Sequence, residues 1–372
     1  MVRRLGLWLL ALLLIPAPTR AAEKQEKITA KAYALMEAGS GRLLLGEHEH
    51  DRLPMASTTK IMTALLVLEA GEDLDKLIAV DEQAAGTEGS SLYLEAGERI
   101  SLRDLLYGLM MKSGNDAAVA LAIHMDGSVT AFADRMNRRA AELGCSDTHF
   151  VNPNGLHDPE HYTSAYDLCR MAASAMALPL FRELVSTERY TTTTGDRVRT
   201  FQTKNKTLTQ VEGGCGVKTG YTKKAGRCFC FAAQREGMLL IGAALNAPDM
   251  WGDAKKLLDK GFSEYELYTF LAPGGTAGRV SVTGSTKKTL PAAAKEGILY
   301  PVRRDGQDET SLDIRLPDSV AAPVAPGEEL GEAVLTVNGE RVKAVPLIAR
   351  EGASPLTFGW FVRRVLEGYV AS

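Results

Sequence analysis

The chain has 372 residues, of which 45% are hydrophobic and 24% charged, enough for the cores of about two globular domains. Its formal net charge of −3 argues against a nucleic-acid-binding protein, because such proteins usually carry a strong basic excess. The sequence also contains no glycine-rich nucleotide-binding loop.

Residues 1–22 have the pattern of a secretory signal peptide. Arg3 and Arg4 precede an apolar run from Leu5 to Ile15, and a segment with small residues around Ala21 follows. A membrane-spanning helix would need about 20 apolar residues, so this run is too short to be one. We therefore expect an exported protein that works outside the cytoplasm.

Residues 28–272 are expected to form one α+β domain. Alternation from Ala30 to Leu45, with turn residues from Glu37 to Gly41, predicts a hairpin. The expected helices are 57–70, 102–111, 116–125, 129–143, 166–177 and 253–268, and the expected later strands are 216–219, 227–234 and 238–245. This order predicts an antiparallel sheet in which the first strand pairs with the late ones, with a helical lobe inserted between them.

Residues 276–350 are expected to form a small all-β domain. The composition changes at Pro273-Gly274-Gly275, and short alternating segments with turns follow. Among them Asn338-Gly339 is a strong signal for a two-residue hairpin turn. This part of the chain contains no candidate catalytic cluster.

Residues 354–372 are expected to form an amphipathic helix. Its apolar positions are Phe358, Phe361, Val362, Val365, Leu366 and Tyr369. The alternative is a terminal helix packed on its own domain. A helix in a membrane interface is favoured, because it uses both the aromatic residues, Trp360 included, and the basic pair Arg363-Arg364. Two central arginines disfavour a membrane span.

The cysteines and histidines suggest no metal site. The five cysteines are Cys145, Cys169, Cys215, Cys228 and Cys230. Cys215 could pair with Cys228 or Cys230 on a neighbouring strand, while buried free thiols are the simpler expectation. His157 and His161 are four residues apart, but the proline between them disfavours the helix that a zinc pair would need.

The segment from Met55 to Lys60 places a serine and a lysine three residues apart, directly before an apolar helical run. Ser57 could simply be a helix N-cap, and about one S-x-x-K match is expected by chance in a chain of this length. On a helix, however, residues i and i+3 lie on one face. A lysine buried there has a lowered pKa, so Ser57 and Lys60 could be a nucleophile and its base.

Two later segments supply the other groups that such a site needs. Ser113 and Asn115 lie at a junction between expected helices, where a hydroxyl can relay a proton and a carboxamide can donate to a substrate amide. An ordinary turn is the alternative. Lys218 and Thr219 offer a cation and a hydroxyl on an expected strand, and Gly220 lets a substrate backbone approach the strand edge. The order S-x-x-K, S-x-N, K-T-G is a strong signal, although each motif alone is weak.

In this order the motifs resemble those of the penicillin-binding and serine β-lactamase superfamily. The chain is most similar to the low-molecular-mass D-alanyl-D-alanine carboxypeptidases, which the stretches THFVNPNGLHDPEHYTSAYDL (148–168) and KTGYTKKAGRCF (218–229) also resemble. The resemblance implies a β-lactamase/penicillin-binding-protein-like catalytic domain at 28–272, followed by the β domain and the anchoring helix. It implies peptidoglycan stem peptides as substrates, β-lactams as covalent inhibitors, no cofactor, and attachment to the outer face of the cytoplasmic membrane.

The resemblance also implies a role for each motif residue. Ser57 would attack the carbonyl of the penultimate D-alanine, and Lys60 would take its proton, giving an acyl-enzyme that water then releases. Ser113 would assist proton transfer to the leaving D-alanine, and Asn115 would hold the substrate amide.

Residues of the K-T-G strand would bind the reacting end of the substrate. Lys218 and Thr219 would face the terminal carboxylate, and the backbone N–H groups of Ser57 and Tyr221 would form the oxyanion hole. Relatives often carry an arginine just after the last core strand to bind this carboxylate, but the segment from Ala247 to Gly252 has none.

Other functions stay open at this point. A D,D-endopeptidase or a β-lactamase would use the same groups. Fast β-lactam hydrolysis would need a base before the K-T-G motif, and Glu183 and Glu188 lie in that interval. A catalytically silent envelope scaffold is the remaining alternative, against which the presence of every motif residue argues.

Overall fold

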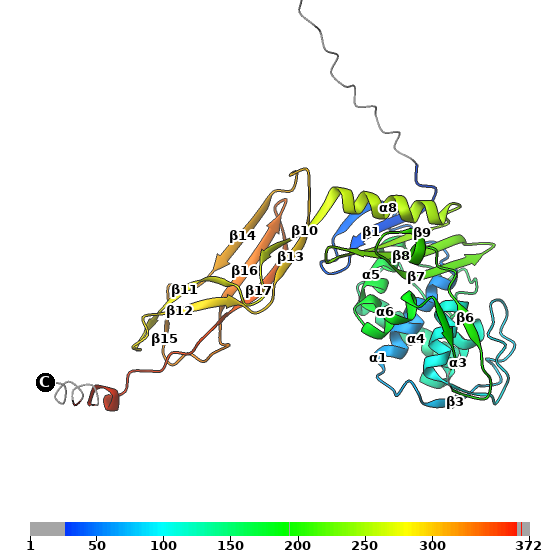
Figure 1. Ribbon diagram of the computed structural model, residues 1–372, viewed down its shortest axis with the longest axis horizontal. Coiled ribbons are helices and arrows are strands. Elements are labelled where there is room, and N and C mark those ends of the chain that lie inside the picture. Colours follow the sequence, from blue (N-terminus) through cyan, green and yellow to red (C-terminus); the bar gives the residue numbers. More distant parts are fainter. Residues whose placement is uncertain (1–26, 193, 363–365, 367–372) are drawn as a thin grey trace, which may run out of the picture.

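The computed structural model describes residues 27–192, 194–362 and 366. These residues form a larger domain of helices and strands and a smaller, elongated domain of strands (Figure 1). The predicted signal peptide, residues 1–22, lies outside the described residues. Of the expected terminal helix, residues 354–362 and 366 are described.

A five-stranded antiparallel sheet supports the larger domain, with the strand order β2-β1-β9-β8-β7. The bounds are β1 Ala32–Glu37, β2 Leu43–Glu47, β7 Gly214–Thr222, β8 Gly226–Arg235 and β9 Met238–Leu245. The predicted pairing of the first strand with the late ones is confirmed, because β1 lies between β2 and β9. Strand β7 is at the edge of the sheet, so one of its sides is left for other groups.

The segment between β2 and β7 forms the predicted helical lobe. Its helices are α1 Lys60–Glu69, α2 Leu102–Tyr107, α3 Asn115–Asp126, α4 Val129–Glu142, α5 Ala165–Met176, α6 Pro179–Ser186 and α7 Thr207–Gln210. Two hairpins complete the lobe, β3 Leu77–Ala79 with β4 Arg99–Ser101 and β5 Arg189–Thr191 with β6 Thr200–Gln202. The hairpins, α6 and α7 were not predicted, because such short elements give little periodicity.

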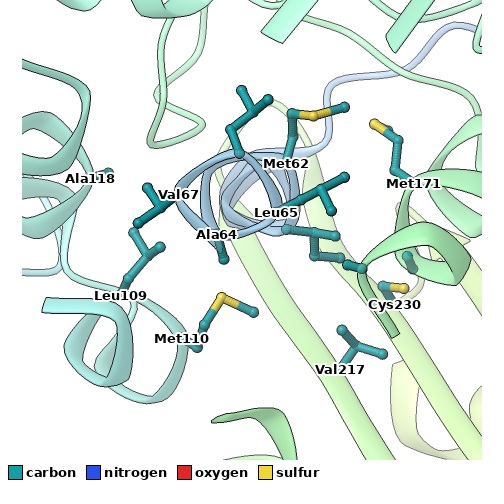
Figure 2. Packing of buried hydrophobic residues seen from close by; sticks show 14 of the residues in the cluster. Met62, Ala64, Leu65, Val67, Leu109, Met110, Ala118, Met171, Val217 and Cys230 are labelled. Carbon is teal, nitrogen blue, oxygen red and sulfur yellow. The ribbon is translucent and has the colours of Figure 1, made fainter. Parts of the chain in front are cut away.

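Helix α1 lies in the centre of the lobe and is buried on all sides from Lys60 to Val67. Figure 2 looks along this helix and shows Met110 on one side of it and Met171 and Cys230 on another. A helix that is apolar all round requires such complete burial. Its first turn is therefore a rigid base for the residues that precede it.

Helix α8, Met250–Glu264, covers the opposite face of the sheet and packs on phenylalanines of β8. The sequence predicted that this helix would continue to Tyr268. It ends at Glu264 because the next residues, rich in aromatic side chains, form strand β10, Tyr265–Leu271.

The smaller domain begins with β10, which pairs with β13, Ile298–Arg303. Strand pairing therefore places residues 265–271 in the β domain, although the sequence had assigned them to the domain at 28–272. The remaining strands are β11 Thr276–Thr283, β12 Thr289–Ala294, β14 Thr310–Arg315, β15 Ser319–Ala321, β16 Glu329–Val337 and β17 Glu340–Ala349. The predicted hairpin at Asn338-Gly339 is confirmed, with φ of 52° and 82° at these residues.

Arg42, in the turn between β1 and β2, joins the two domains. Its guanidinium binds both carboxylate oxygens of Asp308 at 2.8 Å and donates to the Pro301 carbonyl at 2.7 Å. This hydrogen-bonded pair holds the pKa of Asp308 well below its usual range. Tyr265 also donates to the Leu44 carbonyl, so the domains contact each other through specific polar bonds.

Near the C-terminus the chain leaves the β domain and enters a helical turn at Phe358. Leu356 N donates to Gly284 O at 2.7 Å, which ties the chain to the β domain up to this residue. Beyond it Phe358 is 84% and Phe361 53% exposed. No helix in the described part of the chain has the length and apolar character to cross a membrane.

All five cysteines are free thiols. Cys228 and Cys230 are buried and Cys215 is half-buried, so the disulfide alternative is excluded and the expectation of free thiols is confirmed. Burial raises the pKa of Cys215 and of Cys228 to about 11, which keeps both as neutral thiols.

Candidate active site

Ser57 lies inside a 3₁₀-helical turn, Ala56–Thr59, that leads directly into α1. Neither this turn nor α1 begins with a side-chain cap, so the N-cap alternative for Ser57 is wrong. Instead, Ser57 Oγ lies 3.0 Å from Lys60 Nζ. Ala56 has a φ of 49°, a left-handed conformation that is unfavourable for a residue other than glycine. The candidate nucleophile is therefore held in a strained turn on a buried helix.

Lys60 is fully buried and has three oxygen partners. Its Nζ lies 2.7 Å from Asn115 Oδ1, 2.5 Å from the Asn154 carbonyl and 3.0 Å from Ser57 Oγ. Asn115 Nδ2 donates to the Glu88 carbonyl at 2.5 Å, which fixes the orientation of the amide and leaves Oδ1 toward the lysine. The second N–H of that amide remains for a substrate.

This arrangement makes neutral Lys60 a base for Ser57. Burial lowers the pKa of Lys60 well below its ordinary value, and the nearby charge of Lys218 lowers it further. A neutral amine has two N–H donors and one lone pair. Asn115 Oδ1 and the Asn154 carbonyl can only accept, so they take the two N–H groups. The lone pair is then left for the Ser57 hydroxyl, as a general base requires.

The Asn154 carbonyl is a functional group that the sequence reasoning missed. Asn154 lies in the N-P-N-G stretch, and Gly155 has a φ of +89°. A Cβ at Gly155 would lie 2.0 Å from the Ala56 carbonyl, so a glycine is needed where this loop meets the serine turn. A main-chain carbonyl leaves no signal in residue type, but the turn-forming N-P-N-G could have indicated a tightly packed loop.

The edge strand β7 contacts the turn that carries Ser57. A Cβ on Gly220 would lie 2.8 Å from Ser57 N and 3.1 Å from Met55 O. The protein's own backbone therefore approaches Gly220 closely, and the approach of a substrate backbone to this strand edge stays a prediction. Tyr221 follows directly, and the two residues expected to form the oxyanion hole, Ser57 and Tyr221, both line the cavity at this edge.

Lys218 is also buried, and its Nζ lies 2.9 Å from the Thr219 carbonyl. Burial, with the charge of Lys204, lowers the pKa of Lys218 to about 7. Near neutral pH this amine is therefore protonated in only part of the molecules.

Ser57 opens into a cavity of about 490 Å³. Of the residues predicted from the sequence, Ser57, Ser113, Lys218, Thr219, Gly220 and Tyr221 line this cavity. Lys60 and Asn115 are buried beside Ser57. The lining also contains four basic residues, Lys112, Lys204, Lys218 and Arg227, and no acidic residue from the described part of the chain. The cavity therefore suits an anionic ligand.

Neither glutamate proposed for a β-lactamase lines the cavity. Glu183, on α6, accepts a hydrogen bond from the Tyr107 hydroxyl at 2.8 Å and faces a different pocket. Glu188 is also absent from the lining. Within the described residues, no group of His, Cys, Asp and Glu could hold a metal ion.

A buried histidine supports the serine turn through a chain of hydrogen bonds. The Val151 N–H donates to His161 Nδ1 at 3.0 Å, so the ring proton lies on Nε2. Nε2 then donates to Thr59 Oγ1 at 2.8 Å, and Thr59 Oγ1 donates to the Ala56 carbonyl at 2.8 Å. This chain requires neutral His161, and burial lowers its pKa to about 4.

The His161 network predicts a loss of stability in acid. The unfolded chain binds a proton near pH 6.5 but the native protein only near pH 4, so stability falls as the pH drops through this window. The loss should reach about 3 kcal/mol below pH 4. The free energy of unfolding in urea would be measured at pH 7 and at pH 4 for the protein and for His161→Gln. The difference between the two pH values should be smaller for the variant. An equal difference in both proteins would contradict the assignment.

Both domains of the chain match models of known protein families. The sequence model described as D-alanyl-D-alanine carboxypeptidase, peptidase S11, matches residues 19–249. The model of the C-terminal domain of penicillin-binding protein 5 matches residues 265–353, which begin where β10 begins.

Individual relatives cover most of the chain. The D-alanyl-D-alanine carboxypeptidase DacF of Bacillus subtilis is 32% identical over 385 aligned residues, which cover 98% of each chain. That of Streptomyces strain K15 is 36% identical over 267 residues, 66% of this chain and 91% of the relative. The solved structure of penicillin-binding protein 5 from Haemophilus influenzae superposes with a TM-score of 0.74 at 28% identity, covering 88% of this chain and 98% of that one.

Proposed function

Since this chain belongs to the D-alanyl-D-alanine carboxypeptidase family, we propose that it removes the terminal D-alanine from peptidoglycan stem peptides through an acyl-enzyme on Ser57. It is a serine hydrolase of cell-wall metabolism. β-Lactams, the ligands for which penicillin-binding proteins are named, would acylate the same serine.

The geometry supports the first proton transfer, from Ser57 to Lys60, and places Ser113 on the same cavity. Ser57 Oγ attacks the carbonyl carbon of the penultimate D-alanine while its proton passes to the Lys60 lone pair. The N–H groups of Ser57 and Tyr221 stabilise the oxyanion. The C–N bond then breaks, and the amine of the leaving D-alanine receives a proton with the help of Ser113. Water attacks the ester and restores the serine.

The environment of Lys60 is the observation that carries this proposal. In its neutral form the amine gives its two N–H groups to two obligate acceptors, Asn115 Oδ1 and the Asn154 carbonyl, and its lone pair then faces Ser57 Oγ at 3.0 Å. A silent scaffold has no need of a fully buried lysine, because burying one disfavours its charged form. The absence of an acidic residue from the described cavity lining favours a peptidase over a β-lactamase of the kind that uses a glutamate.

Release of free D-alanine tests the proposal. Purified protein starting at residue 23 would be incubated with diacetyl-Lys-D-Ala-D-Ala, and D-alanine would be measured over time. We expect steady release that a β-lactam stops at one equivalent of bound inhibitor. Ser57-dependent β-lactam labelling without release of D-alanine would show that the machinery acts on another substrate.

The enzyme is also proposed to work outside the cytoplasm, on the outer face of the cytoplasmic membrane. The signal-peptide pattern of residues 1–22 supports export. The exposed side chains of Phe358, Phe361 and Val362 support an apolar helix face that leaves the β domain and enters the membrane interface.

Removal of the tail should abolish membrane binding. Ser285 Oγ donates to the Ser354 carbonyl and Leu356 N to Gly284 O, so the deletion should begin at Thr357 to spare these bonds. In co-sedimentation with phosphatidylglycerol vesicles, the protein from residue 23 onward should bind and the deleted form should stay in solution. Replacing Phe358 and Phe361 by serine should weaken binding at least 10-fold, because each buried phenylalanine contributes about 2 kcal/mol. Undiminished binding of the deleted form would favour a helix packed on the protein.

A further inference from the structure

A substrate that ends in a free carboxylate needs a cation in the site. Lys218 alone carries a full positive charge in only part of the molecules. With a pKa of about 7, its amine is partly neutral at physiological pH. The start of α8 supplies no replacement, because residues 247–252 contain no arginine. Asp253, which follows, is fully buried and accepts hydrogen bonds from Thr29 and Ala30.

Three other cations line the cavity: Lys112, Lys204 and Arg227. All three are exposed. A lysine is a flexible point charge, whereas an arginine is always charged and presents two parallel N–H groups that match a carboxylate. Arg227 is therefore chemically the best suited of the three.

The strand register places Arg227 beside the K-T-G motif. Thr219 lies opposite Phe229, and Tyr221 lies opposite Arg227. Since side chains alternate along a strand, these four residues share one face of the sheet. Thr219 and Arg227 are diagonal neighbours on adjacent strands, about 7–8 Å apart at the backbone, which a long side chain spans.

The cavity passes around the edge strand β7, from the Ser57 turn that packs against Gly220 to the face that carries Thr219 and Arg227. The ring of Phe229 packs against Trp251, with centroids 4.7 Å apart, and Trp251 lines the cavity together with Ser57 and Thr219. A ligand that reacts at Ser57 can therefore place its end between Thr219 and Arg227.

The guanidinium of Arg227 is available for such a ligand. Its described hydrogen bond goes to the Pro248 carbonyl at 3.4 Å, which is long, and no described carboxylate lies within ion-pair distance. Arg42 and Arg199, by contrast, are each bound to a carboxylate that is 3% exposed.

We propose that Arg227 binds the terminal carboxylate of the substrate together with the Thr219 hydroxyl, and so makes the enzyme selective for peptides that end in a free carboxylate. This inference rests on the proposed peptidase function and assigns a specificity-determining residue to it. Lys218 and Lys204 would then hold the carboxylate less specifically.

The test compares two substrates that differ only at that carboxylate. Values of kcat/KM would be measured with diacetyl-Lys-D-Ala-D-Ala and with its C-terminal amide, for the protein, Arg227→Gln, Arg227→Lys and the control Lys224→Gln. Lys224 is an exposed residue in the turn between β7 and β8 and does not line the cavity. Arg227→Gln should lower kcat/KM for the acid roughly 10- to 100-fold, which is typical for a lost charge-assisted hydrogen bond, and leave the amide unchanged. For the acid, kcat/KM of Arg227→Lys should lie between the values of Arg227→Gln and the unaltered protein. Lys224→Gln should match the unaltered protein.

Two results would overturn the proposal. An equal loss for acid and amide would show that Arg227 supports the fold or another part of the substrate. No loss for the acid would show that the lysines bind the carboxylate. Unchanged thermal unfolding of Arg227→Gln is the check that this exposed position tolerates the change.

A second readout separates this proposal from the peptidase function. Acylation of Ser57 would be followed with benzylpenicillin and with its methyl ester, which lacks the free carboxylate. If no variant releases D-alanine, the peptidase proposal fails, and the acylation rates alone decide on Arg227. Loss of the preference for benzylpenicillin in Arg227→Gln then supports the assignment, and a retained preference overturns it.

Discussion

Replacing Ser57 by alanine is expected to reduce D-alanine release by roughly 10⁴-fold or more and to abolish covalent labelling by a fluorescent penicillin. The physical reason is that no other nucleophile is aligned with Lys60, whose described oxygen partners are Ser57, an amide and a carbonyl. The measurements are D-alanine release at saturating peptide and in-gel fluorescence of the labelled protein.

The fold should survive this change, because Ser57 is partly exposed and caps no helix. Near-ultraviolet circular dichroism and the thermal midpoint should match the unaltered protein. Ser113→Ala is the matched control, since it removes a second hydroxyl from the same cavity but should slow release without preventing labelling. Labelling that persists in Ser57→Ala would place the nucleophile elsewhere.

Lys60→Met is expected to slow acylation by about 10²- to 10⁴-fold, the usual contribution of a general base. Methionine keeps the length of the buried chain but removes the lone pair that faces Ser57. It also leaves Asn115 Oδ1 and the Asn154 carbonyl without the amine, which should lower stability by about 1–3 kcal/mol. The measurements are the acylation rate with benzylpenicillin and urea unfolding.

Lys255→Met provides the matched control for that experiment. Lys255 is exposed on α8, pairs with Asp259 and does not line the cavity. Its variant should acylate at the normal rate. Normal acylation by a folded Lys60→Met protein would show that another group takes the Ser57 proton.

The fold was predictable where local pattern determines it. The turn cluster from Glu37 to Gly41 and the Asn338-Gly339 pair each gave a hairpin, because few residues adopt the backbone angles that such turns require. The end of α8 was not predictable in this way, since residues 265–268 can continue a helical pattern. Their pairing with β13, some 30 residues later, makes them a strand.

The site was predictable as a set of groups but not as a geometry. The order of the motifs predicted that Ser57, Ser113 and Lys218 belong to one site, and the structure places all three on one cavity. The roles of Asn154 and His161 were missed, because a main-chain carbonyl and a histidine that holds a turn have no characteristic spacing. The sequence marked Gly220 as a site of close approach, but only the structure shows that the backbone of the Ser57 turn also packs against it.

By itself, the sequence determined which reactive groups the chain carries, their order and the local elements that hold them, because residue type and short-range periodicity are sufficient for that. Only the tertiary structure decided that Lys60 is buried between Asn115 and Asn154, which are 55 and 94 residues away in the chain. It also decided that Arg227 shares a sheet face with Thr219. Burial and register arise from long-range packing, and these two properties set the basicity of the lysine and the direction in which the arginine can act.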